Sequence, residues 1–233
     1  AVLLKERQEM NKALDLQKKV LTISGLISEG EKITREEIQR RFAKNVRARV
    51  IDLRTGSPAE GIDPAGFDQH AAAADPERSK PAPPNAAKVR RIPNNALIYE
   101  VVRDDEIQAI ILPVEGKGLW STLYGFLALR PDVRTIDGIT FYAHGETPGL
   151  GGEVDNPNWK ALWKGRKAFD EKWQPRIVVK KGRAGSPEED PYHVDGLSGA
   201  TMTSRGVTHL LAFWLGDDGF GRYLERYRSE RGT

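Results

Sequence analysis

The pattern of apolar and polar residues predicts helices at both ends of the chain. Residues 1–24 read as a mostly polar helix that stops at Gly25. One face of this helix carries Met10, Ala13, Leu14, Gln17 and Leu21. Residues 207–215 have apolar side chains at i, i+3, i+4, i+7 and i+8, which is typical of an amphipathic helix. The same spacing over residues 220–227 predicts a last helix.

Between these helices the pattern predicts strands. Residues 46–53 alternate apolar and polar positions, as a half-buried strand does. Residues 96–102 and 107–114 are apolar runs around a short charged segment, which predicts a hairpin. Residues 139–143 and 177–179 are two further strand candidates. Strands mixed with terminal helices predict an α+β fold.

Two features of the first hundred residues refine this picture. Thr34 followed by Glu37 is a capping-box pattern, which predicts the start of a short helix. Alanine and proline make up half of residues 58–87, so this stretch is either a linker or an ordered excursion with one short Ala-rich helix. We expect partial order, because Ile62 and Phe67 would otherwise have nowhere to bury.

Composition and charge exclude several function classes. The chain has 233 residues, with 36 Lys plus Arg and 33 Asp plus Glu, and the net charge of +3 argues against a dedicated nucleic-acid protein. Cysteine is absent, which excludes a Cys nucleophile, a thiolate zinc site and an iron–sulfur cluster. No apolar run reaches the roughly 20 residues that a spanning helix needs. The apolar start at residues 1–4 fits either the end of a hydrophobic segment or an ordinary helix start.

Two short motifs point to enzyme chemistry without completing it. His144 and Glu146 have the H-x-E spacing of zinc deaminases, but the cysteines of that site are missing. Residues 196–200 come within one residue of the G-x-S-x-G pattern of serine hydrolases, with Ser198 as the nucleophile. The residues before Ser198 make a poor strand, and His209 would need an acid from elsewhere. A hydrolase therefore stays an alternative.

Residues 195–204 form a hydroxyl-rich segment that runs into the predicted helix over 207–215. The first N–H groups of a helix lack partners within it and suit a phosphate, and Gly196 and Gly199 allow a ligand to approach the backbone. The alternative is that Ser198 or Thr201 only caps the helix. Residues 144–152, with four glycines, and residues 116–121, with a tryptophan, are two further candidate pocket loops.

Together these segments carry a resemblance. The stretches G-x-G-L-W-S, H-G-E-T-P-G-L-G-G-E and D-G-x-S-G-A-T occur in this order in the chain. The sequence resembles the C-subunit of the sodium-translocating NADH:quinone oxidoreductase. That family belongs to the wider FMN-binding domain family, which it shares with the G-subunit of the Rnf electron-transport complex.

The resemblance implies a fold and a cofactor. The fold would be an FMN-binding domain with an antiparallel β-sheet core and flanking helices. Residues 1–33 would be an N-terminal helix and membrane-proximal segment, residues 34–90 would pack on the main domain, and residues 91–233 would be the FMN-binding core. FMN would be bonded covalently through its phosphate to Thr201, with a flavin transferase making the bond from FAD with a divalent cation. No residue would be catalytic, and no metal would be bound.

The resemblance and the helix geometry also assign roles to side chains around Thr201. The recognition motif would consist of Asp195, Gly196, Ser198, Gly199 and Ala200. Thr203 and Ser204 would donate further hydrogen bonds to the phosphate. The isoalloxazine and ribityl pocket would be lined by Trp120, His144, Glu146, Thr147 and Leu150. For Trp120, His144 and Glu146 a packing role is the alternative.

Finally, the resemblance implies a place in the cell and a set of partners. In that family the C-subunit has one N-terminal transmembrane helix in the bacterial inner membrane and a periplasmic flavin domain. With the other subunits it would relay electrons from NADH towards ubiquinone, while sodium crosses elsewhere. The alternatives are the G-subunit of the Rnf complex and a flavin-free exported binding module.

Overall fold

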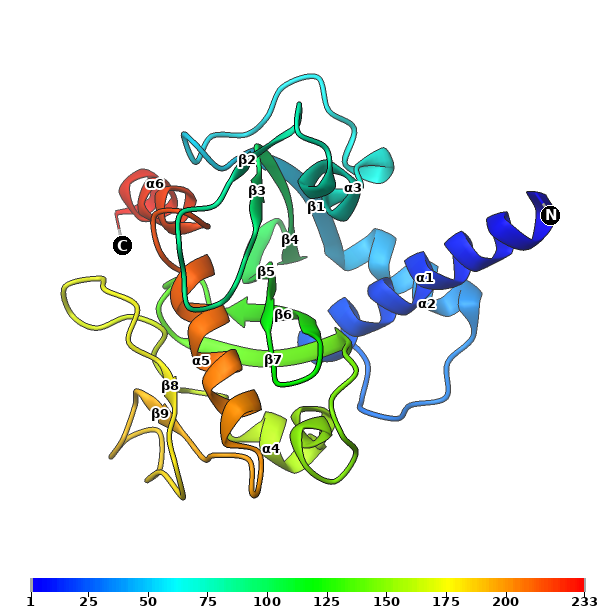
Figure 1. The fold of residues 1–233 in the computed structure, drawn as a ribbon. Coiled ribbons are helices and arrows are strands. Elements are labelled where there is room, and N and C mark those ends of the chain that lie inside the picture. Colours follow the sequence, from blue (N-terminus) through cyan, green and yellow to red (C-terminus); the bar gives the residue numbers. More distant parts are fainter. Residues whose placement is uncertain (1, 233) are drawn as a thin grey trace.

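A five-stranded antiparallel sheet forms the centre of the computed structural model, which describes residues 2–232 (Figure 1). The strands lie in the order β1-β4-β5-β6-β7, and each neighbouring pair is antiparallel. Their bounds are β1 Val46–Asp52, β4 Asn95–Arg103, β5 Glu106–Lys117, β6 Thr122–Leu129 and β7 Ile136–Ala143. β1 comes from the segment before residue 91 and pairs with β4, so the sheet draws on both parts of the chain.

Helices lie on both faces of this sheet, and two small sheets lie beside it (Figure 1). The α-helices are α1 Val2–Ile23, α2 Arg35–Asn45, α3 Gln69–Ala74, α4 Pro157–Ala161, α5 Thr201–Trp214 and α6 Gly221–Arg231. The 3-10 helices are η1 Pro64–Gly66 and η2 Gly151–Asp155. The small sheets pair β2 Ser79–Pro81 with β3 Arg91–Pro93, and β8 Val178–Val179 with β9 His193–Val194. The predicted α+β class is confirmed.

The two faces of the sheet belong to two separate hydrophobic cores. Along β5, Ile110 and Leu112 face one core and Ile111 faces the other, because successive strand side chains point to opposite faces. Along β6, Leu127 faces the same core as Ile110, and Phe126 faces the same core as Ile111. Both faces are covered, so these strands read as continuous apolar runs.

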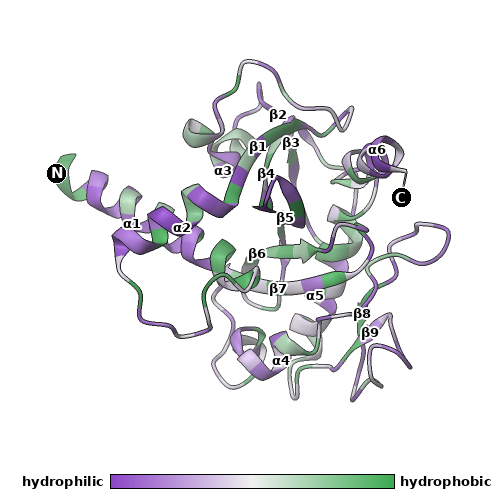
Figure 2. Cartoon of the chain, turned by 180° about the vertical axis from the view of Figure 1, so that it is seen from behind, coloured by the Kyte–Doolittle hydropathy of each residue, from purple (hydrophilic) through white to green (hydrophobic). Residues whose placement is uncertain are grey.

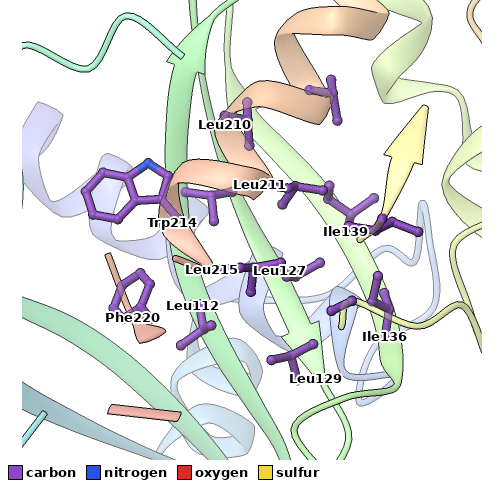
Figure 3. Close-up of a cluster of buried hydrophobic side chains, with 14 of the residues drawn as sticks. Leu112, Leu127, Leu129, Ile136, Ile139, Leu210, Leu211, Trp214, Leu215 and Phe220 are labelled. Atoms are coloured by element: carbon purple, nitrogen blue, oxygen red, sulfur yellow. The ribbon is translucent and has the colours of Figure 1, made fainter. Parts of the chain in front are cut away.

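The larger core lies between the sheet and α5 (Figure 3). Leu210, Leu211 and Trp214 of α5 are fully buried. Leu211 lies beside Ile139 of β7, and the Trp214 ring lies next to Phe220 (Figure 3). The indole N–H of Trp214 donates to the backbone oxygen of Glu115 at 2.8 Å. The helix that carries the hydroxyl-rich segment is therefore fixed to the sheet along its length.

The smaller core lies under the end of α1 and under α2. Within α1 only Val20 and Leu21 are buried. The predicted apolar face is covered only towards its end: Met10 and Ala13 are exposed, Leu14 and Gln17 are half-buried, and Leu21 is buried. The first turns of α1 extend away from the body and end in an apolar tip (Figures 1 and 2). Among the described residues, no helix is both long enough and apolar enough to cross a membrane.

Several local predictions can be compared with the structure directly. Thr34 caps α2, since its hydroxyl accepts from the Glu37 N–H at 3.2 Å. The predicted hairpin is β4–β5, and its two turn residues, Asp104 and Asp105, both have positive φ, as a type I′ turn requires. The Ala/Pro-rich stretch is ordered around η1 and the short helix α3.

One strand of the central sheet and several short elements were not predicted from the pattern; the short ones include β2, β3, α4 and η2. Strand β6 was not predicted, although it is an apolar run of the same kind as β4 and β5. The short strand β9 was also missed, since the sequence before Asp195 looked too poor for a strand. Ile62 and Phe67 are half-buried in the excursion, as the expected partial order requires.

Candidate functional site

The candidate site is built around the N-terminus of α5. The helix begins at Thr201, and the residue before it, Ala200, is buried and offers no side-chain cap. No acidic residue lies in the first turn. Because the first N–H groups of a helix have no partners within it, this helix start favours an anion. Thr201 itself is exposed.

Four hydroxyl groups occur between residues 198 and 204, and the structure divides them into two pairs. Ser198 and Thr201 are exposed. Thr203 is fully buried and its hydroxyl donates to Glu146. Ser204 is 5% exposed, and its oxygen accepts from the N–H of Leu197 at 3.0 Å. Thr203 and Ser204, predicted as donors to a phosphate, thus have their hydroxyls in contacts within the protein.

The loop before α5 is held from both sides. The indole N–H of Trp159 donates to the backbone oxygen of Asp195 at 2.8 Å. The Asp195 carboxylate accepts from the N–H of Ala184 at 2.9 Å, and Gly196 N–H donates to Gly182 at 2.9 Å. Trp159 ties the loop to α4, and the contacts with Ala184 and Gly182 tie it to the segment that joins β8 and β9. Asp195 therefore shapes the loop through its own hydrogen bond.

A groove of about 810 Å³ runs along this junction and contains Thr201, Ser198 and Gly199. Its basic lining residues are Lys180, Lys181, Arg183, Arg205 and His209. We call this hollow the basic groove. Its cations lie beside an uncapped helix start, and both features favour a negatively charged ligand.

The Glu146 side chain joins two of the predicted loops to α5. Its Oε1 atom accepts hydrogen bonds from the N–H groups of Trp120 and Ser121, each at 3.0 Å, and from Ser121 Oγ at 3.2 Å. Its Oε2 atom accepts from the N–H of Leu119 at 3.1 Å and from Thr203 Oγ1 at 2.6 Å. The loop of residues 144–152, the turn before β6 and the first turn of α5 therefore meet at one carboxylate.

The surroundings keep this carboxylate ionised. Burial on its own would raise the pKa of Glu146. The hydrogen bonds from Thr203 and from the backbone N–H groups of Ser121, Trp120 and Leu119 outweigh burial and lower the pKa below its usual range. Glu146 is therefore an anion at neutral pH, with its acceptor positions already used.

His144 is also engaged within the protein. Its Nδ1 atom accepts from the backbone N–H of Glu146 at 3.1 Å, which leaves the proton on Nε2. Nε2 lies 2.7 Å from a carboxylate oxygen of Asp155. For His144 and Glu146 the packing role that the sequence left open is the one that the contacts support.

Large apolar side chains are exposed near the same helix start. They are Leu119 at 43%, Trp120 at 66%, Leu150 at 44% and Met202 at 52% exposed. We call these four residues the apolar rim. A Cβ atom added to Gly199 would lie 3.0 Å from Leu150, so Leu150 lies next to the loop before α5. Outside the rim, the exposed large apolar residues of the described chain lie on α1. The exposed Thr147 belongs to the same loop as Leu150.

The structure does not support the two enzyme alternatives. Ser198 lies within the loop after β9, three residues before α5, and not at a strand-to-helix elbow. Among the hydrogen bonds of residues 2–232, none joins Ser198 to a histidine. The same part of the chain contains no cluster of three His, Asp or Glu residues that could hold a metal ion.

Some residues of the site could have been found from spacing. Arg205 and His209 follow Thr201 at i+4 and i+8, so they share its helix face. Arg205 was not predicted, and His209 was considered only as the histidine of a hydrolase. Leu119 and Met202 are neighbours of predicted residues and were also missed. Lys181 has no signal in the sequence, because only the fold brings its loop to α5.

The site thus offers an exposed hydroxyl at a helix start, cations beside it and an apolar rim. These features fit flavin mononucleotide, which joins an anionic phosphate to a planar, largely apolar ring. The family model of the FMN-binding domain matches residues 118–216, a range that includes Thr201, Glu146 and the whole apolar rim. The fold is that of an FMN-binding domain.

Relatives define the family more closely. The chain is 46% identical over 231 residues to the C-subunit of the Na(+)-translocating NADH-quinone reductase of Pseudomonas aeruginosa, a match that covers 98% of this chain and 88% of that protein. It is 45% identical to the same subunit of Vibrio alginolyticus, covering 98% of this chain and 87% of that one. The chain belongs to the C-subunit family of the Na(+)-translocating NADH-quinone reductase.

Solved structures agree with this assignment. The crystal structure of Shewanella oneidensis NqrC matches with a TM-score of 0.84 and 38% identity, covering 92% of this chain and 97% of that chain. The crystal structure of the Na(+)-translocating NADH-quinone reductase C-subunit from Parabacteroides distasonis matches with a TM-score of 0.71 and 27% identity, covering 95% and 96%. The predicted family is confirmed, and with it the placement among subunits of an oxidoreductase.

Proposed function

We propose that this chain is the FMN-carrying electron-transfer C-subunit of a sodium-translocating NADH-quinone reductase, with FMN attached through its phosphate to Thr201. The observation that carries the proposal is the exposed Thr201 hydroxyl at the start of a helix with no side-chain cap. Thr203 and Ser204, the neighbouring hydroxyls within the helix, are buried in internal hydrogen bonds. Ser198 is exposed but lies outside the helix start.

The chain's own residues would hold the cofactor by charge and by apolar contact. The first-turn N–H groups of α5 would bind the phosphate, and Arg205, one turn further on, adds a cation on the same helix face. Trp120 and Leu150 offer apolar surface to the flavin ring, and Thr147 adds an exposed hydroxyl. When bound, FMN supplies reversible electron transfer, so no side chain needs to act as an acid or a base.

The wider setting follows from the family. A flavin transferase would transfer FMN from FAD to the Thr201 hydroxyl with a divalent cation. The new phosphoester bond at Thr201 would replace the pyrophosphate bond of FAD, and AMP would leave. The subunit would then relay electrons from NADH towards ubiquinone together with the other subunits. An N-terminal helix would anchor it in the bacterial inner membrane, with the flavin domain on the periplasmic side. C-subunit relatives at 43–46% identity over 98% of the chain support this setting over the G-subunit of the Rnf complex.

The test compares Thr201→Ala with Ser198→Ala, because these variants remove the two exposed hydroxyls one at a time. Each protein is produced with an active flavin transferase, denatured and run on a gel, and flavin fluorescence is read from the protein band. We expect the signal to disappear in Thr201→Ala and to stay at the wild-type level in Ser198→Ala. A fluorescent band that survives in Thr201→Ala would overturn the attachment site.

A further inference from the structure

The Glu146 side chain accepts an unusually large number of hydrogen bonds. Five hydrogen-bond donors from two other segments point at its two oxygens, and each lies within 2.6–3.2 Å. An ionised carboxylate only accepts hydrogen bonds, so it can satisfy all five donors at once. A glutamine of the same size would turn an NH₂ group towards at least one set of these donors.

We propose that Glu146 is the positioning residue of the flavin site. Its carboxylate joins the turn that contains Trp120 to the first turn of α5. It also holds the Thr203 hydroxyl inside the protein, which leaves Thr201 as the residue that accepts the flavin phosphate. The proposal rests on the proposed function, because it concerns the same site. It adds that the flavin-facing turn and the attachment residue form one rigid unit.

The packing around the carboxylate shows that this arrangement is specific. A Cβ atom added to Gly118 would lie 2.7 Å from Glu146 Oε1, and one added to Gly151 would lie 3.0 Å from Oε2. At Gly118 the Glu146 carboxylate would have to move to admit a side chain, and at Gly151 the added Cβ would clash with the Thr203 hydroxyl that Glu146 holds. The two glycines, one from each predicted loop, therefore allow the backbone to close around Glu146. His144 accepts the Glu146 N–H and so fixes the residue from its backbone side.

The same contact accounts for the choice of hydroxyl. Thr201 and Thr203 lie two residues apart at the start of α5, and both have the side chain that the attachment needs. Thr203 is fully buried and bonded to Glu146 at 2.6 Å, whereas Thr201 is exposed in the basic groove. A buried hydroxyl that donates to a carboxylate is not free to receive a phosphoryl group from an external donor.

The experiment uses Glu146→Gln and Thr203→Val, with Glu153→Gln as the matched control. Glu153 lies in the same loop region, but its carboxylate accepts only from the Asn156 side chain in this structure. Amide hydrogen exchange of the segment 118–121 is measured on protein without flavin, and the initial rate of covalent flavin loading is measured with a purified flavin transferase. Because the first readout needs no flavin, it tests Glu146 even if Thr201 is not the attachment site.

We expect exchange of the segment 118–121 to become about tenfold faster or more in Glu146→Gln, a few-fold faster in Thr203→Val, and unchanged in Glu153→Gln. Flavin loading should slow in the same order, and peptide mapping should still place the flavin on Thr201 in Thr203→Val. Unchanged exchange in Glu146→Gln would overturn the proposal. Faster exchange with wild-type loading would also overturn it, because Glu146 would then act on the fold alone. Loading that fails in the wild type would instead count against the proposed function.

Discussion

The starts of α2 and α5 differ in what binds the first backbone N–H groups of the helix. At α2, the Thr34 hydroxyl caps the Glu37 N–H, and two acidic residues follow in the first turn. At α5, Ala200 provides no cap and no acid follows. At α2 the chain's own side chains bind a free N–H group and place negative charge near the positive end of the helix dipole. At α5 the first N–H groups and the positive end of the dipole stay available to a ligand.

The two helices also differ in what holds them in place. α2 buries only Ile38, so its cap contributes much of its local stability. α5 buries seven residues, and its core contacts replace the missing cap. A helix that receives an anion at its start can lack a cap when the rest of it is packed firmly. The buried residues of α5 therefore provide its stability, while its first turn is available for ligand binding.

The largest expected effect comes from the core beneath α5. Trp214 is fully buried and donates to Glu115, so Trp214→Ala removes both a large side chain and a hydrogen bond. We expect a loss of about 3–5 kcal/mol in the free energy of unfolding, measured by urea denaturation of the flavin-free protein. A loss below about 1 kcal/mol would mean that core packing does not replace the cap at α5.

A smaller effect is expected at the capped helix. Thr34→Ala should lower the free energy of unfolding by about 1 kcal/mol, because the Glu37 N–H loses its partner. Covalent flavin loading should stay at the wild-type level, since α2 lies in the smaller core. Urea denaturation and the fluorescence of denatured, loaded protein check the two parts. Reduced loading in this variant would contradict the separation between the two helix starts.

The smallest effect concerns the acidic first turn of α2. Hydrogen bonds from Arg40 and then Arg41 lower the pKa of Glu37 to about 2 from its ordinary value of 4.5. The stabilising contribution is therefore present above pH 4.5 and is lost as the pH falls from 4.5 towards 2. Because Glu37 and its two arginine partners are partly exposed to water, the effect should be small and should weaken in high salt.

Urea unfolding of the wild type and of Glu37→Gln, taken through this pH range at low and high salt, measures that contribution. We expect the wild type to lose slightly more stability than the variant as the pH falls, and less so at high salt. An equal loss in both proteins at low salt would show that electrostatics does not stabilise the α2 start.

Much of this contrast could be predicted from local sequence. The capping box at Thr34 and the apolar spacing over residues 207–215 both act within a few residues, so both gave the correct helix. The helix start was not predicted correctly: α5 begins at Thr201, six residues before the predicted range, and the cap position is Ala200 instead of Ser198 or Thr201. The short strand β9 escaped prediction because its two residues, His193 and Val194, pair only through the fold.

The rest of the site depends on contacts between distant residues. Glu146 and Thr203 lie 57 residues apart, and the sequence near either residue does not predict the hydrogen bond between them. Both were predicted to contact the cofactor, and in the structure they are hydrogen-bonded to each other. A motif identifies which residues matter, while the fold decides which of them face the ligand and which hold those that do.

Whether Thr201 carries a flavin is tested most directly by the intact mass of the protein produced together with an active flavin transferase, followed by peptide mapping. We expect a mass gain of one FMN less one water, located on the peptide that contains Thr201. An unmodified mass, with the transferase shown to be active on a control substrate, would contradict the proposal and would return Thr201 to an ordinary residue at a helix start.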